Sequence, residues 1–333
     1  MQLTFSEIQA ITTGAVRMTE EADGIHFYRF TAQQEEFYQK RKEEFYQKTF
    51  AASGVTLRFR TDSQKLSLAA EISRLVPRCY YAIEVQVSGQ RIGSINNFEG
   101  QELPLNYPTA QLELGPVQKE FDLGPGLKEV RILLPWIVKT VLQSICLDDG
   151  AVLEPIKPQK KLLCFGDSIT QGYDALYPSR KYTTQLADFL GAEEFNKAIG
   201  GEIFVPGLAE LGDDLEPDYI TVAYGTNDWS AMGREYVEKS SREFYCNLRK
   251  TYPNAPIYAI TPIWRGDKDM EKPVGPFSDV PKIIAAAIEG LPNVKLVNGY
   301  EFVPQDTRYF ADQRLHPNDS GFCQYAENLK KYF

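Results

Sequence analysis

The pattern of apolar residues changes at a Pro- and Lys-rich stretch, and this change constrains the fold more than any other feature. From about residue 52 to 150, apolar and polar residues alternate in short runs separated by Gly, Pro, Asn and Asp. Such alternation is typical of antiparallel strands with one face in water, and we expect no helix there. The stretch LEPIKPQK at 153–160 is predicted to be a linker. The sequence therefore predicts an all-β sandwich, jelly-roll-like in kind, as an accessory domain over residues 1–152.

After the linker, near-continuous apolar runs alternate with segments of helical period. The runs are KLLCF, EEFNKA, YITVAYG, PIYAITPIW and NVKLVNGY, and the helical segments lie near 180–190, 230–251, 279–290 and 318–331. Apolar strands interleaved with helices indicate a parallel sheet that helices cover on both faces. The predicted fold class of residues 161–333 is therefore α/β, a doubly wound parallel sheet. Such sheets bind ligands beyond the carboxyl ends of their strands.

A short repeat precedes the alternating region. EEFYQK occurs at 35–40 and again at 43–48. Its aromatic residues recur at a spacing close to two helical turns, which predicts an amphipathic helix with one aromatic edge. We expect this helix to cover an edge or an end of the sandwich. The alternative is a lid or an oligomer contact.

Composition excludes several classes of partner. The 333 residues carry a formal net charge of −9 without a basic stripe, which argues against nucleic acid and against an anionic membrane surface. The N-terminal stretch MQLTFSEIQA lacks the features of a signal peptide, and no segment approaches a membrane span. The five cysteines are far apart and mostly lie in apolar runs, so we expect reduced core residues in a cytoplasmic protein. The oligomeric state is not predicted.

Residues capable of chemistry follow the predicted strands or precede the last helix. They occur in four stretches, which are Gly166-Asp167-Ser168, Asn196 to Gly201, Gly225 to Trp229, and Leu315 to Asn318. The chain has only two histidines. His26 lies in the strand-like run GIHFYRF and is expected to pack, whereas His316 lies in a polar loop before a helix. A mechanism that needs an imidazole base therefore depends on His316.

Together these residues resemble the SGNH (GDSL) hydrolases, which are named for the Ser, Gly, Asn and His of four sequence blocks. The resemblance covers roughly residues 160–333 and rests on GDSIT, GTND and LHPND in this order. It implies a flavodoxin-like sheet and hydrolysis of esters of lipids, sugars and other small molecules, without a metal or another cofactor. A β-sandwich before such a domain is similar to the arrangement in two-domain carbohydrate acetylesterases.

The resemblance assigns a role to each matching residue. Ser168 is the expected nucleophile and His316 the general base that takes its proton. The N–H of Gly201, the side-chain amide of Asn227 and the N–H of Ser168 form the expected oxyanion hole. Each assignment has a structural alternative, because serine also caps helices and Gly and Asn also form turns. Asp167 and Asp228 are expected to order the loops.

One position departs from the family pattern. The family places an aspartate three residues before the histidine, but here that residue is Gln313. Asp312, four residues before His316, can reach the imidazole around a helical turn, and we favour it. Alternatively, a backbone carbonyl such as that of Gln313 orients the imidazole in a Ser–His dyad. In a third alternative, Asp267 or Asp269 supplies the carboxylate.

Several further residues lie just beyond the predicted strand ends. As substrate contacts we expect Tyr173, Asp174, Trp229, Trp264 and Arg265. In the sandwich half, the polar cluster in RFRTDS at 58–63 is expected to be a solvated or interdomain face.

The sequence leaves three functional hypotheses. The first is a serine esterase that removes a small acyl group, such as acetyl, from a carbohydrate or a similar small molecule. The second is an acyltransferase that passes the same acyl group from Ser168 to an acceptor. The third is a non-catalytic carbohydrate-binding protein on a hydrolase fold.

Overall fold

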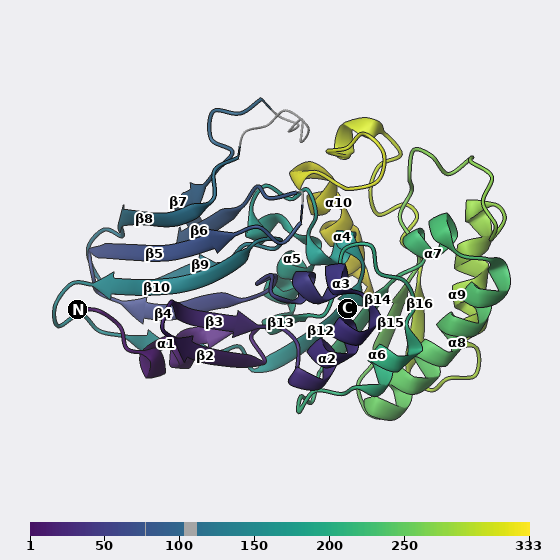
Figure 1. Ribbon diagram of the computed structural model, residues 1–333, viewed down its shortest axis with the longest axis horizontal. Helices are drawn as coiled ribbons and strands as arrows, with labels where there is room; N and C mark the ends of the chain where they lie inside the picture. The colour runs from purple at the N-terminus through teal and green to yellow at the C-terminus, as the bar shows by residue number, and fades with distance from the viewer. Residues whose placement is uncertain (77, 103–111) are drawn as a thin grey trace.

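The computed structural model describes residues 1–76, 78–102 and 112–333. Two parts lie beside each other along the longest axis of the molecule (Figure 1), a β-rich part that contains the N-terminus and an α/β part. This division agrees with the change of apolar pattern in the sequence.

The β-rich part consists of two antiparallel sheets, as the alternating runs predict. In the order of their pairing, sheet A contains β2 (Arg17–Glu21), β3 (Gly24–Tyr28), β10 (Lys139–Leu147), β5 (Lys65–Ser73) and β8 (Gly115–Asp122). Sheet B contains β1 (Thr12–Thr13), β4 (Thr56–Thr61), β9 (Lys128–Leu133), β6 (Ala82–Val87) and β7 (Gln90–Asn96), and β11 (Glu154–Pro155) also pairs with β4. Alternate side chains of both sheets form one apolar core, to which α1 (Phe5–Ile11) contributes. Strands β7 and β8 were not predicted, because few of their residues are apolar and buried.

The α/β part is built on a parallel sheet with flavodoxin-like strand order. Sheet C contains β13 (Ala192–Asn196), β12 (Lys160–Gly166), β14 (Tyr219–Ala223), β15 (Ile257–Ile260) and β16 (Val294–Val297). The apolar core on one face includes α6 (Pro206–Glu210), α8 (Arg234–Thr251) and α9 (Val280–Ile288), and that on the other includes α5 (Tyr182–Leu190) and α10 (Asp319–Leu329). The predicted doubly wound sheet is therefore confirmed.

Short helices lie at the ends of the strands and between the longer helices. They are α4 (Ser168–Gln171), α7 (Thr226–Ala231), and the 3₁₀ helices Pro178–Arg180, Phe277–Asp279, Thr307–Tyr309 and Lys330–Tyr332. Helix α4 follows β12 and α7 follows β14, so both begin at the carboxyl edge of sheet C. This edge is where the fold predicts a ligand site.

The EEFYQK repeat differs from its prediction. It forms two helices, α2 (Ala32–Arg41) and α3 (Glu43–Thr49), with extended backbone at Lys42 between them. Tyr38 and Phe45 join the apolar core on one face of sheet C. The expectation of a single helix over the sandwich is therefore wrong, because the aromatic edge is buried against the α/β part.

Other sequence predictions have mixed outcomes. His26 is buried in β3, which confirms that it packs in a strand. All five cysteines are free, and Cys79 and Cys164 are buried. Within the described ranges we find no helix with the length and hydropathy of a membrane span. The domain limits 1–152 and 161–333 stay a prediction.

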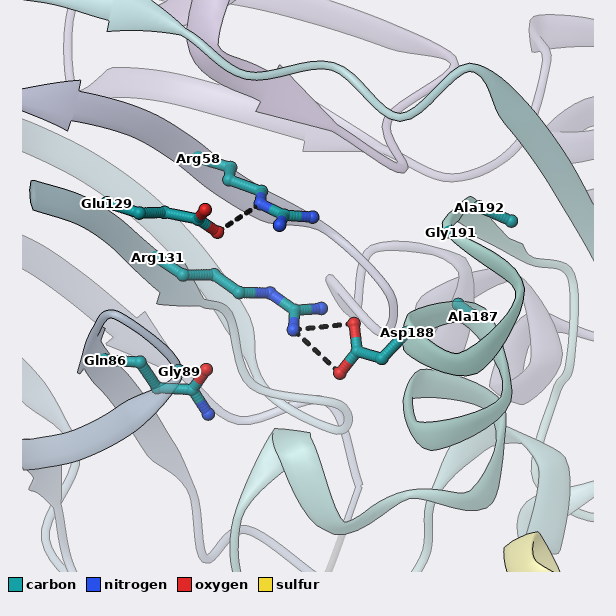
Figure 2. A pocket seen from close by; sticks show the side chains of 9 residues that line it. All are labelled: Arg58, Gln86, Gly89, Glu129, Arg131, Ala187, Asp188, Gly191 and Ala192. Carbon is teal, nitrogen blue, oxygen red and sulfur yellow. Dashed lines mark hydrogen bonds and ion pairs between the residues drawn. The ribbon is translucent and has the colours of Figure 1, made fainter.

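Polar contacts join the two parts. Arg131 on β9 donates from Nη1 to both carboxylate oxygens of Asp188 on α5, at 2.8 and 2.9 Å. Beside it, Arg58 Nε donates to Glu129 Oε1 at 2.6 Å. These side chains line a cavity of about 310 Å³ between sheet B and α5 (Figure 2). Arg58 of the RFRTDS cluster thus lies at an interdomain face, as predicted.

Candidate active site

Ser168 and His316 meet at the carboxyl edge of sheet C. The buried strand β12 ends at Gly166, and Asp167 caps α4 by accepting from the Ile169 N–H at 2.9 Å, which places Ser168 at the first helical position. The Oγ atom of Ser168 lies 2.8 Å from Nε2 of His316. Both side chains are buried. This distance is within hydrogen-bond reach of a nucleophile and its base.

Asp312 holds the other side of the imidazole. Its Oδ2 atom lies 2.8 Å from Nδ1 of His316. Its Oδ1 atom accepts from the backbone N–H groups of Arg314, Leu315 and His316. The loop can fold back in this way because Gln313 takes a left-handed conformation, with φ of 55°. The carboxylate that the sequence favoured is therefore the one in contact with His316.

The hydrogen bonds to Asp312 keep its carboxyl ionised. Burial acts to raise the pKa of Asp312, but the hydrogen bond and charge of His316 and the N–H groups of Leu315 and His316 outweigh burial and hold the pKa well below its usual range. A carboxylate accepts hydrogen bonds only, so Nδ1 of His316 is the atom that carries the proton. Nε2 is then left with a lone pair directed at Ser168.

The other two candidate carboxylates have different partners. Asp267 pairs with Arg265 and Arg314. Asp269 is exposed and pairs with Lys268. Within the described residues, neither has a hydrogen bond to His316.

Hydrogen bonds tie the loops of Gly201 and Asn227 to α4 and to each other. Gln171 in α4 accepts from the Gly200 N–H through Oε1 at 2.7 Å. Asn227 donates from Nδ2 to the Glu202 carbonyl at 3.0 Å. The four stretches that the sequence singled out are therefore gathered at one place.

Gly201 has the properties of an oxyanion donor. Gly201 is exposed, and its φ of 87° lies in the left-handed region that favours glycine. Among the residues that the structure describes, its N–H has no hydrogen-bond acceptor. The N–H of Ser168 belongs to the first turn of α4, where N–H groups have no acceptor within the helix.

Two buried aspartates order the loops, as expected. Asp228 accepts from the N–H groups of Phe204 and Gly225, each at 3.0 Å, and so joins the segment just after the second stretch to the third stretch. Asp167 caps α4. Burial is the main cause that raises the pKa of each carboxyl to about 7.

Tyr173 and Asp174 lie beside the imidazole. The Tyr173 ring stacks on the His316 ring with centroids 5.7 Å apart. Asp174 Oδ2 lies 3.7 Å from Nδ1 of His316, and Asp174 Oδ1 accepts from the Tyr80 hydroxyl at 3.2 Å. Both Tyr173 and Asp174 are buried, so they pack against the His316 ring on the side away from solvent.

Sequence reasoning missed Arg78, which the β-rich part contributes to this site. Its Nη1 atom lies 3.3 Å from Nδ1 of His316 and 3.3 Å from Asp174 Oδ2. Carboxylate oxygens of Asp174 and Asp312 and a ring nitrogen of His316 lie within 4.8 Å of one another, close enough to hold a metal ion. The Arg78 guanidinium supplies positive charge beside this cluster. No local sequence signal marks Arg78, because its position depends on how the two parts pack.

Two expected substrate contacts lie elsewhere. Trp229 is fully buried, donates from Nε1 to the Gly275 carbonyl at 2.9 Å and packs on Phe277. Arg265 is buried and donates to Thr226. These two residues therefore pack beneath the segment that contains Asn227. Neither side chain is exposed to contact a substrate.

Trp264 is buried, although less completely than Trp229. It packs on Phe310 with ring centroids 5.3 Å apart and keeps 9% of its surface exposed. Its expected substrate contact stays a prediction.

Comparison with known proteins agrees with the fold and the motifs. Residues 164–322 match the GDSL-like lipase/acylhydrolase family. A comparison with curated proteins found no match. Among solved structures, the salicylyl-acyltransferase SsfX3 from a tetracycline biosynthetic pathway is similar, with a TM-score of 0.80 and 21% identity over 96% of this chain and 92% of that chain.

Two further structures have similar folds. A putative GDSL-like lipase from Bacteroides ovatus has a TM-score of 0.77 and 18% identity, over 100% of this chain and 95% of that chain. A family two carbohydrate esterase from Clostridium thermocellum, solved with cellohexaose, has a TM-score of 0.65 and 14% identity, over 85% of this chain and 92% of that chain. The α/β part of this chain therefore contains a domain, at residues 164–322, that matches the GDSL-like lipase/acylhydrolase family, and this match supports an ester hydrolase.

Proposed function

We propose that the protein is a serine esterase in which Ser168 is the nucleophile, His316 the general base and Asp312 the group that orients the imidazole. The observation that carries this proposal is the pair of 2.8 Å contacts on the two sides of the His316 ring. A serine hydroxyl attacks poorly unless a base removes its proton, and this arrangement supplies the base in the required tautomer.

The reaction proceeds in two steps. As Ser168 Oγ bonds to the ester carbonyl carbon, its proton moves to Nε2 of His316, and the carbonyl electron pair moves to the oxygen. When the tetrahedral intermediate collapses, the bond to the leaving oxygen breaks and His316 protonates that oxygen. Water, deprotonated by His316, then releases the acyl group from Ser168 in the same manner.

The negative oxygen of the intermediate needs fixed donors. We assign this role to the N–H of Gly201, the second amide hydrogen of Asn227 and the N–H of Ser168. The left-handed φ of 87° at Gly201, which favours glycine, and the lack of an acceptor for its N–H among the described residues support the assignment. Asn227 is held at Glu202 by one amide hydrogen, which leaves the other for the substrate.

The substrate class rests on the similar folds. We propose an ester of a small acyl group, such as acetyl, with a carbohydrate or a similar polyhydroxylated molecule. The carbohydrate esterase from Clostridium thermocellum and an acetyl xylan esterase from Butyrivibrio proteoclasticus, which resemble this chain in fold, support this choice. We further propose a reducing, cytoplasmic location, which the five free cysteines support.

An acyltransferase is the second candidate. The structural match to the salicylyl-acyltransferase covers 96% of this chain with a TM-score of 0.80, and an acyltransferase by definition passes an acyl group to an acceptor. The two candidates share the acylation step and differ only in the acceptor. Reactions with and without added alcohols, analysed for ester product and for free acid, distinguish them.

The test of the esterase is hydrolysis of p-nitrophenyl acetate, butyrate and octanoate and of acetylated sugars. We expect hydrolysis by the wild-type protein, fastest with acetate, and none above background by Ser168→Ala with an unchanged melting temperature. Ser179, which hydrogen-bonds Glu84 away from the site, provides the matched control Ser179→Ala. Equal rates for wild type and Ser168→Ala would contradict the proposal.

A further inference from the structure

The peptide that joins Gly200 to Gly201 has a buried cation on its carbonyl side. Nζ of Lys48 donates to the Gly200 carbonyl oxygen at 2.8 Å. A trans peptide is planar, so the N–H of the next residue points away from that carbonyl. The Gly201 N–H is therefore directed away from Lys48. Among the described residues it has no acceptor.

A second buried cation, Arg29, binds two further carbonyls of the segment that leads to Gly201. Arg29 Nη1 donates to the carbonyls of Asn196 and Ala198, at 2.6 and 3.1 Å. Lys48 donates to the carbonyl of Gly200, which is two residues further along the chain. Two buried cations from the N-terminal segment thus fix alternate peptide planes of the segment that leads to Gly201.

Burial of the Lys48 ammonium adds little net stability, because its ion pair and hydrogen bond must first offset the loss of its hydration. The residue is 5% exposed, and an ammonium removed from water is costly unless it is paired and hydrogen-bonded. Its carboxylate partner is Glu44, 2.6 Å away and half exposed, and the Phe45 ring lies 5.0 Å from Nζ. The equivalent lysine of the first EEFYQK repeat, Lys40, is 74% exposed and pairs with Glu36. The repeat thus places one lysine at the candidate site and the other in solvent.

We propose that Lys48 is a positioning residue of the oxyanion hole, which fixes the Gly200–Gly201 peptide plane and polarises it so that the Gly201 N–H is a stronger donor. A hydrogen bond to a peptide carbonyl strengthens the donor at the opposite end of the same peptide. The gain is largest when the substrate oxygen carries negative charge, so it lowers the barrier more than it aids substrate binding. This inference rests on the proposed esterase.

The test compares Lys48→Met with Lys40→Met in hydrolysis of p-nitrophenyl acetate. Removal of a whole oxyanion donor typically lowers kcat by about 10²–10³-fold. We expect Lys48→Met to lower kcat by about 10–100-fold with KM within about twofold, since the donor is weakened and not removed. Lys40→Met should match the wild type. Lys48→Arg, which keeps a cation, should recover most of the lost kcat.

The alternative outcomes are distinct. A kcat of Lys48→Met within twofold of wild type, or a rise in KM with kcat unchanged, would overturn the role of Lys48. If Lys48→Met does not melt cooperatively, Lys48→Gln replaces it under the same criteria. If the wild-type protein hydrolyses the ester no faster than Ser168→Ala, both the proposed esterase and the role of Lys48 are contradicted. If the wild-type protein is active and Lys48→Met is equally active, only the role of Lys48 is contradicted.

Discussion

Nε2 of His316 lies 2.8 Å from Oγ of Ser168, although the two residues are 148 positions apart in the chain. The contact joins α4, which follows the first strand of the parallel sheet in the chain, to the loop before α10. Asp312 completes the arrangement from the same loop as His316. The chemistry therefore depends on the C-terminal loop being held against α4.

Asp312→Asn tests what orients the base. The amide can donate to Nδ1 of His316, which favours the tautomer with the proton on Nε2 and removes the base. By analogy with the same change in a serine protease, we expect kcat to fall by about 10²–10⁴-fold with KM little changed. Asp269→Asn is the control and should match the wild type. A nearly fully active Asp312→Asn variant would favour the Ser–His dyad.

Asp312 also predicts a pH dependence of stability. Its folded pKa lies well below the unfolded value of 3.8, so its stabilising contribution is fully present above that value and is lost as the pH falls below it. The difference in melting temperature between wild type and Asp312→Asn should therefore stay nearly constant from pH 6 to 5 and shrink as the pH falls from about 4 toward 2. Thermal unfolding at several pH values measures this difference. A gap that widens toward acid pH would contradict the sign.

Asn227→Ala tests the proposed side-chain donor of the oxyanion hole. Loss of one such donor typically lowers kcat by about 10²–10³-fold, and we expect KM to change much less. Asn247 on α8, which hydrogen-bonds Glu210, gives the control Asn247→Ala. If kcat/KM fell only through KM, Asn227 would bind the substrate and not the oxyanion.

Arg78→Ala tests whether the β-rich part serves the reaction. The guanidinium lies 3.3 Å from Oδ2 of Asp174, the carboxylate beside the imidazole, and opposite unit charges about 4 Å apart attract by roughly 1–4 kcal/mol at effective dielectric constants of 80 to 20. We expect kcat/KM to fall by about tenfold, which equals ~1.4 kcal/mol. Arg60→Ala, an exposed change on β4, is the control. Full activity of Arg78→Ala would restrict the β-rich part to a structural role.

Trp229→Phe tests the correction of an expected substrate contact. The change removes a buried hydrogen bond to Gly275 and leaves part of a packed volume empty. We expect a loss of about 1–3 kcal/mol in the free energy of unfolding with KM unchanged. Chemical denaturation and Michaelis–Menten kinetics on one preparation give both values. A raised KM at unchanged stability would restore the substrate contact.

The sequence predicted features that local pattern encodes. The strands of sheet C are short apolar runs, and the turn after β12 carries Ser168 because Asp167 is a good helix cap. Asp312 was favoured because it lies four residues before His316, but the two side chains meet across a loop that folds back at Gln313 and not on a helical turn.

Long-range packing decided the features that the sequence missed. The aromatic edge of the EEFYQK repeat indicates burial but not the surface that buries it. Arg78 is 238 positions from His316, so nothing near it in the chain indicates the contact. Trp229 follows a strand end, where an aromatic side chain can face a ligand or the interior, and its packing on Phe277 selects the interior.

Covalent labelling of Ser168 tests the central claim most directly. The wild-type protein is incubated with a fluorophosphonate probe, digested and analysed by mass spectrometry, with Ser168→Ala treated in parallel. The predicted result is one adduct, on the peptide that contains Ser168, and no adduct in the variant. An unlabelled wild-type protein, or an adduct on another serine, would contradict the assignment of Ser168 as an activated nucleophile.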